Sequence, residues 1–370
     1  MNRKIKFSIV GCGRISYRHI EAIRDNPFAE LIAVCDLNLE KARLARGDSS
    51  AGVYQNYHEM LTKEQIDVVC LMTPSGMHGE HAVDIIETYQ KHLVIEKPLT
   101  LRVEDGEQVL KMAHKHGVKL FIVHQNRFNK AVTMIRKVIE SGDLGRIVLA
   151  TLRLRWSRGQ AYYDRDPWRG TYALDGGALT NQAIHHLDLL RWLVGDVERV
   201  SAIGATQLVK VEVEDSVCGW LSFKNGAIGT IEATTAVRPL DHDLEASISI
   251  LGEKGVVIAE GAAVNKLTAC SVANVELKDF SEDVPNVYGF GHNVIINNVI
   301  DALLHGTPAL VAAEDALESI RLLNAIYRSI ELGGKEVRMI ECPISERLGV
   351  FTRETEKIAE IYRTEKAMGG

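Results

Sequence analysis

The sequence lacks the features of a membrane protein, a secreted protein or a nucleic-acid-binding protein. Its basic residues form no dense run and are outnumbered 43 to 49 by acidic residues, a net charge of −6, which argues against a nucleic acid partner. Its apolar runs are all shorter than the roughly 18 residues of a transmembrane helix. The N-terminal residues show neither the apolar stretch nor the small-residue cleavage site of a secretory signal. We therefore expect a cytoplasmic protein with no membrane partner.

Cysteine is scarce and scattered. The six cysteines form no Cys-x-x-Cys pair and no regular spacing, so we expect neither a zinc site nor a disulfide framework. Internal repeats and low-complexity segments are also missing. The 370 residues, 46% hydrophobic and 25% charged, are instead ordinary for a globular protein of about two domains. Composition thus says nothing about the chemistry.

The first third of the chain alternates short apolar runs with longer amphipathic segments. Each run is a few residues long and rich in Val, Ile or Leu, as is typical of strands buried on both faces. The runs are Ile5–Val10, Leu31–Cys35, Val68–Met72, Leu93–Ile95 and Leu120–Val123, and a helical pattern covers Val103–His114. This alternation predicts βαβ units with right-handed crossovers and a doubly wound parallel sheet.

The pattern changes after about residue 127. A helix predicted over Ala131–Glu140 is followed by strand-like stretches, several of them separated by Gly-containing turns, which predicts an antiparallel sheet. The stretches are Ile147–Arg155, Val200–Val209, Ser216–Phe223, Ala227–Thr235, Ala246–Leu251 and Val256–Ala259. Further helices are predicted over Ala178–Val194, Val294–Leu304, Ala316–Leu332 and Thr352–Ala367. The last of these is charged, and we expect it to pack on the body or on a partner subunit.

A glycine-containing turn directly follows the first predicted strand and opens a helix, with the sequence Gly11-Cys12-Gly13-Arg14-Ile15-Ser16. In dinucleotide-binding motifs the first glycine permits a tight turn and the second lets the pyrophosphate approach the backbone. The helix N-terminus then presents N–H groups and a positive dipole end to the phosphates. A small residue, Ser16, replaces the third glycine and still permits close packing. We expect Gly11, Gly13, Arg14 and Ile15 to contact a dinucleotide.

Asp36 indicates which dinucleotide is bound. It lies 23 residues after Gly13, at the end of the second predicted strand. The motif has an acid at about this distance, which accepts hydrogen bonds from the ribose hydroxyls. A carboxylate there repels the 2′-phosphate of NADP, and Leu37 and Asn38 supply no positive charge, so the predicted cofactor is NAD. The alternative is that Asp36 only caps the next helix.

Lys97 is the first candidate for acid–base chemistry. It lies between Glu96 and Pro98 at the carboxyl end of the strand predicted at Leu93–Ile95. Ligands of open α/β sheets bind outside this end of the strands, and a residue before proline is held extended. A partly desolvated lysine near a positive nicotinamide can take up a proton or polarise a hydroxyl group. The alternative is a solvated lysine paired with Glu96.

His185 is the second candidate. At about 100° per residue, Asn181, His185 and Asp188 share one face of the helix predicted over Ala178–Val194. A polar stripe on an otherwise apolar helix indicates a cleft, and imidazole is suited to proton transfer near neutral pH. The alternative is a hydrogen-bonded core histidine. His186 points about 100° away from its neighbour, so we expect no metal site here.

Together these features resemble the Gfo/Idh/MocA family of sugar oxidoreductases, through Gly11-x-Gly13, Glu96-Lys97-Pro98 and the Gly176-Gly177 helix with His185. The resemblance covers nearly the whole chain. It implies an α/β protein with a Rossmann NAD-binding domain (residues 1–127) and a C-terminal α+β domain (residues 128–370) built on an open, mainly antiparallel sheet. That sheet often forms the subunit interface, which implies a homo-oligomer, either a dimer or a tetramer. Family members often carry Asp where Asn181 stands, which leaves Lys97 and His185 as the acid–base candidates.

A narrower resemblance is to the WlbA group, the UDP-N-acetyl-2-amino-2-deoxyglucuronate 3-dehydrogenases of surface-polysaccharide biosynthesis. The similar segments are Gln125–Asn129, Tyr162-Tyr163, Trp168–Thr171, Asn181–His185 and Val287–His292. The anions of such a substrate need local donors in an acidic protein, and arginines and aromatic rings suit anions, sugar and uracil. We expect substrate contacts from Arg127, Asn129, Arg158, Tyr162, Tyr163, Asn181, His185 and Tyr288. Singly, each arginine in this set could instead be an ordinary surface residue, and each aromatic residue an ordinary core residue.

Further cofactor contacts are expected from loops that follow the predicted strands. These are Thr73, Pro74, Ser75, His78, Glu96, Lys97 and Gln125, and by resemblance Trp168 and Arg169 reach the nicotinamide half of NAD. The predicted function is NAD-dependent oxidation of the carbon-3 hydroxyl of a UDP-sugar acid. Three alternatives remain: a dehydrogenase of a free sugar, an inositol or a non-uronate nucleotide sugar; a catalytically inactive NAD-binding regulator; and a hydrolase that oxidises its substrate transiently with bound NAD.

Overall fold

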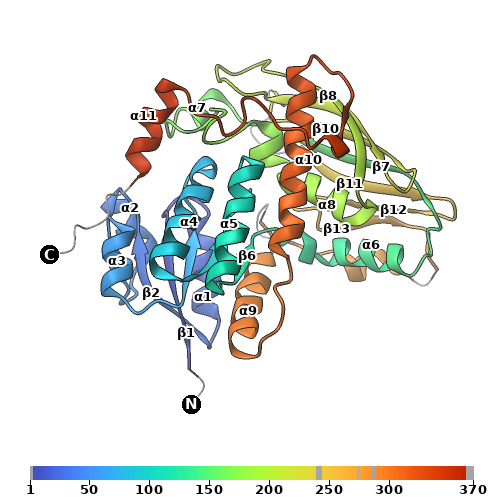
Figure 1. The fold of residues 1–370 in the computed structure, drawn as a ribbon. Helices are drawn as coiled ribbons and strands as arrows, with labels where there is room; N and C mark the ends of the chain where they lie inside the picture. Colours follow the sequence, from blue (N-terminus) through green and yellow to red (C-terminus); the bar gives the residue numbers. More distant parts are fainter. Residues whose placement is uncertain (1–2, 239–243, 274, 285–287, 364–370) are drawn as a thin grey trace. The chain divides into compact units, whose positions relative to one another are not determined.

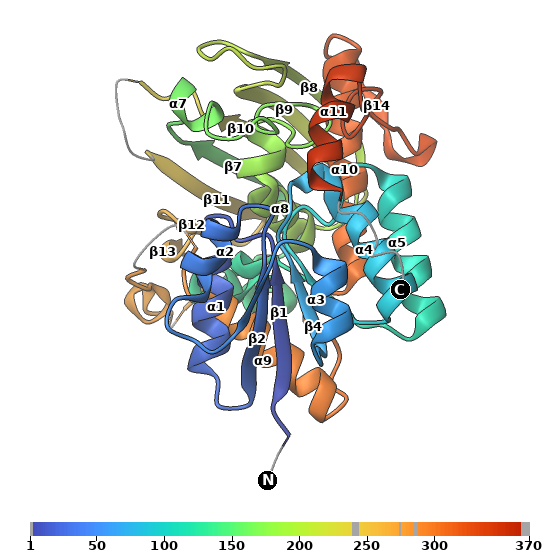
Figure 2. The ribbon, with the colours of Figure 1, turned by 90° about the vertical axis from the view of Figure 1, so that its left-hand side faces the viewer.

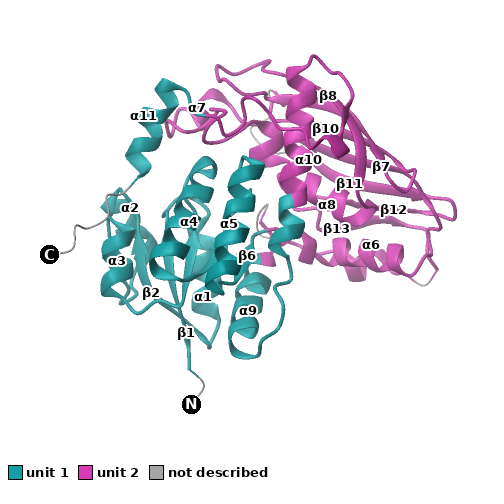
Figure 3. Cartoon of the chain, viewed as in Figure 1, with its two compact units in different colours: residues 1–123, 292–317, 351–370 teal, residues 124–291, 318–350 magenta. Residues whose placement is uncertain are grey.

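The computed structural model describes residues 3–238, 244–273, 275–284 and 288–363. The chain forms two compact units (Figure 3). Unit 1 comprises residues 1–123, 292–317 and 351–370, and unit 2 comprises residues 124–291 and 318–350. The division proposed from the sequence has one boundary, after residue 127, whereas these units have several because the chain returns to unit 1 twice.

Unit 1 is built on a parallel sheet of six strands in the order β3-β2-β1-β4-β5-β6. The strands are β1 (Ile5–Val10), β2 (Ala29–Cys35), β3 (Gly52–Tyr54), β4 (Val68–Leu71), β5 (His92–Ile95) and β6 (Leu120–Ile122). This is the order of a doubly wound dinucleotide-binding sheet, so the predicted parallel sheet is confirmed. Strand β3 was not predicted, because its three residues are half-buried and form no apolar run.

Helices cover both faces of this sheet. Figure 2 shows α1 (Ser16–Asp25) and α2 (Leu39–Arg46) on one side, and α3 (Tyr57–Lys63), α4 (His78–Tyr89) and α5 (Val103–His116) on the other. Central strands are therefore buried on both faces; all four residues of β4 are buried. This double burial is the physical reason for the short continuous apolar runs in the sequence.

Two later helices belong largely to unit 1. They are α9 (Gly291–Leu304) and α11 (Arg353–Tyr362). Beside α11, the Arg363 guanidinium pairs with Glu80 of α4 at 2.8 Å, and the Tyr362 carbonyl lies 3.1 Å from His81 Nε2. The C-terminal helix therefore packs on the body of unit 1. It ends at Tyr362, five residues before the predicted end, and residues 364–370 lie outside the described part of the chain.

Unit 2 is built on a sheet of eight strands in the order β13-β12-β11-β7-β10-β9-β8-β14 (Figure 1). The strands are β7 (Ile147–Arg155), β8 (Val197–Ala205), β9 (Ser216–Phe223), β10 (Ile228–Thr234), β11 (Glu245–Gly252), β12 (Val256–Glu260), β13 (Lys266–Cys270) and β14 (Val337–Arg338). Neighbouring strands are antiparallel except β7 and β10, which run parallel because the β8–β9–β10 meander is inserted beside β7. The predicted, mainly antiparallel sheet is confirmed.

One face of this sheet is covered by helices. On it, α8 (Ile184–Val194) contacts β7 and β11, and α6 (Lys130–Glu140) contacts β12 and β13. Buried and half-exposed residues alternate along β7 and β10, as expected for a sheet with one open face. In α10 (Ala313–Glu331), Ser329 accepts a hydrogen bond from the Ala202 N–H of β8 at 2.9 Å.

Across the described residues, none of the helices combines the length and the hydropathy that crossing a bilayer demands.

Candidate functional site

The turn after β1 has the geometry that a dinucleotide pyrophosphate requires. Gly11 has a φ of +94°, and a Cβ built on it would lie 2.5 Å from the carbonyl oxygen of Met72, so a larger residue would collide with backbone. A Cβ built on Gly13 would meet nothing within 4 Å. The Ser16 hydroxyl donates to the Gly13 carbonyl at 2.7 Å, and no described side chain caps the first turn of α1. The N–H groups of that turn are therefore suited to bind phosphate.

Asp36 connects this turn to the end of β2. Its half-buried carboxylate accepts the N–H groups of Cys12 and Asn38, each at 2.8 Å. The cap of α2 is Asn38, whose Oδ1 accepts the Glu40 N–H at 3.0 Å. The alternative that Asp36 serves as the helix cap is therefore wrong. A carboxylate has about four lone-pair positions, so Asp36 retains acceptor capacity for ribose hydroxyls, and the residues at this turn fit NAD.

Glu96 and Lys97 lie at the carboxyl end of β5. Buried Glu96 has its Oε1 2.8 Å from His19 Nε2 and 3.7 Å from His292 Nε2, and its Oε2 accepts the Lys97 N–H at 3.1 Å. Burial alone would raise the pKa of Glu96, but the hydrogen bonds and charges of the two imidazoles hold it well below its usual range. We call His19, Glu96 and His292 the Glu96 cluster. The pairing of Glu96 with His19 and His292 was not predicted, because the two histidines are distant from Glu96 in sequence and follow no metal-ligand spacing.

The Glu96 cluster also offers metal-ligand chemistry, since one ligand atom from each side chain lies within 4.8 Å of the others. However, Glu96 Oε1 is already at hydrogen-bond distance from His19. We therefore interpret the cluster as a hydrogen-bonded group that fixes the backbone at Lys97, whose side chain is half-buried.

The loop after β4 holds the four residues predicted to line the cofactor cleft. Thr73 is half-buried, and Pro74 precedes the 3₁₀ turn Ser75–Met77. The buried His78 ring lies 2.8 Å from the Pro98 carbonyl and 2.9 Å from the Thr73 carbonyl. His78 therefore ties the loop after β4 to the loop after β5, and burial lowers its pKa. Its contact with the cofactor stays a prediction.

In unit 2, the helix predicted over Ala178–Val194 consists of two pieces. Ala178–Gln182 forms a π-helical turn, in which the Ala183 N–H donates to the Ala178 carbonyl at 2.9 Å, and α8 begins at Ile184. The wider turn breaks the uniform spacing of 100° per residue. The prediction of one regular helix over Ala178–Val194 is therefore wrong, while the shared face of Asn181 and His185 stays a prediction. Such π-helical turns are frequent at functional sites.

His185 is held at the start of α8 by residues that follow β6. Its Nε2 lies 3.2 Å from Gln125 Nε2, and its ring packs edge-on against His124 with the centroids 5.9 Å apart. His185 is 9% exposed and Gln125 is 2% exposed. Gln125, predicted as a cofactor residue, is thus also a hydrogen-bond partner of the proposed acid–base histidine.

A polar network connects the π-helical turn to the loop that follows β7. Gln182 Nε2 donates to the Tyr162 hydroxyl at 3.1 Å and to Asn181 Oδ1 at 2.6 Å. Arg158 donates to Gln182 Oε1 at 3.3 Å, and Arg169 donates to the Tyr162 hydroxyl at 2.8 Å. The structure thus brings together four predicted site residues, and it adds Gln182, which the sequence analysis had not selected.

Asp175 is a second addition to this network. It accepts hydrogen bonds from the Asn181 side chain and, at 2.7 Å, from the Gly170 N–H. A carboxylate therefore does lie beside Asn181, although Asn181 itself has none. The run Asp175-Gly176-Gly177 could have indicated Asp175 from the sequence, because an acidic residue before two glycines can accept hydrogen bonds from nearby backbone N–H groups.

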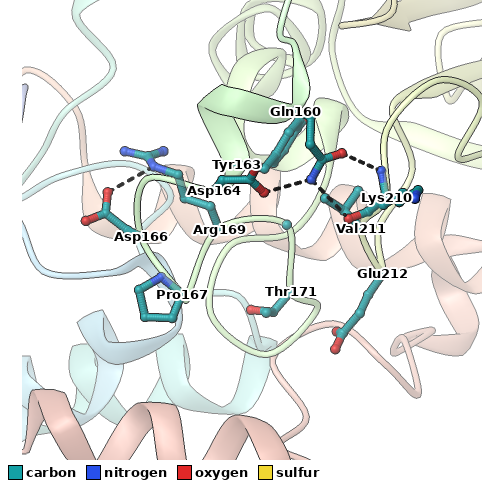
Figure 4. Close-up of a pocket in the computed structure, with 11 residues that line it drawn as sticks. Gln160, Tyr163, Asp164, Asp166, Pro167, Arg169, Thr171, Lys210, Val211 and Glu212 are labelled. Carbon is teal, nitrogen blue, oxygen red and sulfur yellow. Dashed lines mark hydrogen bonds and ion pairs between the residues drawn. The ribbon is translucent and has the colours of Figure 1, made fainter.

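A pocket of about 420 Å³ shares Arg169 with this network (Figure 4). The Arg169 guanidinium contacts Asp166 at 3.2 Å, and its Cζ lies 4.4 Å from the Trp168 ring centroid. Gln160 donates to Asp164 at 2.9 Å on another side of the pocket. The remaining lining residues are Tyr163, Pro167, Gly170, Thr171, Lys210, Val211 and Glu212.

Other predicted substrate residues have interior partners. Arg127 forms a buried bidentate ion pair with Asp188, at 2.7 and 2.6 Å. Asn129 Nδ2 donates to the Ala263 carbonyl at 2.5 Å. The Tyr163 hydroxyl lies 3.2 Å from Thr235 Oγ1, and burial raises the pKa of Tyr163 to about 12. Substrate contacts by these three stay predictions. Tyr288 is half-buried, and Val287 lies outside the described residues.

Comparisons with known proteins extend these observations. Residues 5–124 match the profile of the oxidoreductase family with an NAD-binding Rossmann fold, and residues 132–258 match the GFO/IDH/MocA C-terminal domain. Among curated proteins, the myo-inositol 2-dehydrogenase of Thermotoga maritima is 24% identical over 88% of this chain and 96% of its own length. The D-glucoside 3-dehydrogenase of Escherichia coli is 26% identical over 89% of this chain and 96% of its own length.

Among solved structures, the WlbA dehydrogenase of Bordetella pertussis, crystallised with NADH and UDP-GlcNAcA, is 40% identical with a TM-score of 0.86; the match covers 91% of this chain and 98% of that one. The WlbA dehydrogenase of Chromobacterium violaceum, crystallised with the same two ligands, is 36% identical with a TM-score of 0.84, over 91% of this chain and 96% of that one. With two matching domain profiles and a glycine turn that fits NAD, the chain belongs to the GFO/IDH/MocA oxidoreductases and is an NAD-dependent dehydrogenase of the sugar-oxidising type.

Proposed function

We propose that the chain oxidises the carbon-3 hydroxyl of a UDP-sugar acid of the UDP-N-acetylglucosaminuronate type, as a step in surface-polysaccharide biosynthesis. The observation that carries this proposal is the 40% identity to a dehydrogenase crystallised with NADH and UDP-GlcNAcA. The curated inositol and glucoside dehydrogenases are 24–26% identical and thus more distant.

The polar network of unit 2 supports an anionic sugar nucleotide. Arg158 and Arg169 both stack on the ring of Tyr162, with the guanidinium carbons 5.6 and 4.6 Å from its centroid. In a chain with a net charge of −6, a pyrophosphate or a carboxylate must be held by such local cations rather than by the overall field. Asn181 and Gln182 offer amide groups to sugar hydroxyls from the same network.

The proposed chemistry assigns proton transfer to Lys97 and His185. When bound, NAD supplies a hydride acceptor for the hydrogen on carbon 3, so that the products are a 3-keto sugar, NADH and a proton. The side chain of Lys97 or His185 takes the hydroxyl proton, which it then releases to solvent. Glu96 and Gln125 hold these two residues through the contacts described above. A positioned acid–base group of this kind contributes about 10²–10⁴-fold to the rate.

The second candidate is a dehydrogenase of a free inositol or glucoside, which the names of the curated relatives favour. NADH absorbance with a panel of UDP-GlcNAcA, UDP-GlcNAc, myo-inositol and a methyl glucoside separates the two. We expect the highest kcat/KM with UDP-GlcNAcA. A higher value with inositol or the glucoside would overturn the proposal, and NADH formation with none of the four would point to an NAD-binding regulator or to a hydrolase without net oxidation.

A further inference from the structure

A buried carboxyl group lies directly beneath the π-helical turn. Glu214, just before β9, is 3% exposed, and its Oε1 accepts the Leu179 N–H at 3.1 Å. The backbone carbonyl of Glu214 accepts the Ala178 N–H at 3.0 Å. One residue thus supplies acceptors to two consecutive N–H groups at the beginning of the turn, where helical N–H groups have no partners within the helix.

The Tyr327 hydroxyl completes this arrangement from α10. It donates to Glu214 Oε1 at 3.0 Å, accepts the Gly177 N–H at 3.0 Å and lies 2.8 Å from Thr180 Oγ1. Glu214 and Tyr327 therefore hold four consecutive residues, Gly177–Thr180. The next two residues, Asn181 and Gln182, belong to the polar network proposed to bind substrate.

The fit between Glu214 and the turn is tight. A Cβ on Gly177 would lie 2.1 Å from the Glu214 carboxyl group, so a glycine is required for this approach. Glu214 Oε2 is buried and has no hydrogen-bond partner among the described residues. An unpaired oxygen costs much more free energy when it is ionised than when it is neutral. Burial therefore penalises the ionised form of the carboxyl group more than the protonated form.

We propose that Glu214 is a positioning residue for this dehydrogenase: its neutral carboxyl group, with the Tyr327 hydroxyl, sets the π-helical turn that presents Asn181 and Gln182, and loss of the Glu214 proton weakens sugar binding. The proposal deepens the proposed function, on which it rests for the role of Asn181 and Gln182. It requires no contact between Glu214 and the substrate.

The surroundings of Glu214 place its ionisation in the physiological range. Burial raises its pKa to about 7, and the Asp175 carboxylate adds to this effect, while the bonds from Leu179 and Tyr327 oppose it. The phenol groups of Tyr163 and Tyr172 also interact electrostatically with Glu214, and burial raises the pKa of both phenols. Aspartate and tyrosine supply no positive charge, so only hydrogen bonds, such as those from Leu179 and Tyr327, favour an ionised Glu214, and burial outweighs them.

Infrared spectroscopy of the full chain, without substrate, tests the ionisation. Between pH 6 and 8, we expect the wild type to show a C=O band of a protonated carboxylic acid that disappears as the pH rises through 7 and that is missing from Glu214→Gln throughout this range. Hydrogen exchange at residues 177–180 tests the positioning: it should be slow in the wild type and in Glu214→Gln at pH 6, and at least tenfold faster in Glu214→Ala. The matched control is Glu198→Gln, an exposed glutamate on β8, which should behave as the wild type does.

Kinetics with UDP-GlcNAcA link the turn to binding. In the wild type we expect KM for the sugar to rise about tenfold between pH 6 and 8, and this rise to vanish in Glu214→Gln. The hydrogen bond from Tyr327 lowers the pKa of Glu214 in the wild type. Tyr327→Phe removes this bond and should therefore shift the rise in KM to higher pH. A KM rise that persists in Glu214→Gln, or the absence of the infrared band, would overturn the proposal. Neither infrared nor exchange data depend on the substrate, so a failure of the UDP-sugar assignment would be recognised separately.

Discussion

Two buried glutamates show how neighbouring groups decide protonation. Glu96 faces the imidazoles of His19 and His292, which hold its pKa well below the usual range despite burial. Glu214 faces Asp175 and Tyr327, and burial raises its pKa to about 7. Burial penalises the charged form of both carboxyl groups, so the difference between them comes from partners that can or cannot carry positive charge.

We expect the Glu96 cluster to contribute to the free energy of unfolding in a pH-dependent way. Because the pKa of Glu96 is lower in the folded state than its unfolded value of about 4.5, the cluster stabilises the fold above pH 4.5 and loses this contribution as the pH falls through the folded pKa. We expect Glu96→Gln to lower the free energy of unfolding at pH 7 by about 3–5 kcal/mol, and by less at acidic pH. Urea denaturation measures this difference, with the exposed Glu87→Gln of α4 as control. Equal losses in both variants at pH 7 would contradict it.

The catalytic prediction at the residue scale concerns Lys97 and His185, the two proposed acid–base residues. We expect Lys97→Ala and His185→Ala each to lower kcat by about 10²–10⁴-fold, the usual contribution of acid–base catalysis. NADH affinity should stay within a few fold, as measured by fluorescence titration. Lys111→Ala, on an exposed position of α5, should keep full activity. Near-normal kcat in both site variants would refute the assignment.

At the scale of elements, the β1–α1 turn separates a fold requirement from a binding requirement. A Cβ at Gly11 would collide with backbone, whereas one at Gly13 would enter open space. We expect Gly11→Ala to lower the Tm by several degrees, since about 1 kcal/mol shifts the Tm by about 2–4 °C in domains of 150–250 residues. Gly13→Ala should keep the Tm and weaken NADH binding at least tenfold. Thermal denaturation and NADH titration check both; a wild-type NADH affinity in Gly13→Ala would exclude phosphate binding at this turn.

The elements also show what could be predicted from the sequence. β7 and β9 have the predicted bounds, Ile147–Arg155 and Ser216–Phe223, because alternating burial leaves a local pattern. The π-helical turn left no such pattern. It depends on Glu214 and Tyr327, which are distant in sequence and become its partners only through folding.

The candidate site was predictable to a similar extent. Local motifs predicted Gly11, Gly13 and Asp36 as cofactor residues, and the geometry of the β1–α1 turn fits this prediction, because the turn is a short strand–turn–helix segment. The partners of single polar residues could not be predicted in this way. Arg127 forms a buried ion pair with Asp188, which nothing in its local sequence indicates, and its contact with substrate stays a prediction.

At the scale of the whole molecule, the open face of the unit 2 sheet suggests assembly. It exposes Ile203 by 68%, Ile228 by 56% and Trp220 by 37%, beside ion pairs such as Arg155 with Glu232. Apolar side chains grouped with charges on an uncovered sheet are typical of interfaces. The homo-oligomer expected from the family resemblance, with copies associated through this face, stays a prediction.

Light scattering after size-exclusion chromatography tests this prediction. We expect the wild type to be a dimer or a tetramer, and the double variant Trp220→Glu/Ile228→Glu to form smaller species, because charges on the apolar face oppose its burial. An exchange of exposed Leu44→Glu on α2 is the control and should leave the mass unchanged. A monomeric wild type would contradict the prediction.

The most direct test of the account concerns the hydrogen that the enzyme removes. UDP-GlcNAcA labelled with deuterium at carbon 3 is incubated with the enzyme and NAD, and the reduced cofactor is analysed by mass spectrometry. Oxidation at carbon 3 predicts that the NADH formed carries the deuterium and that its formation is slower than with unlabelled substrate if hydride transfer limits the rate. NADH without deuterium would show that the hydride comes from another carbon and would contradict the proposed reaction.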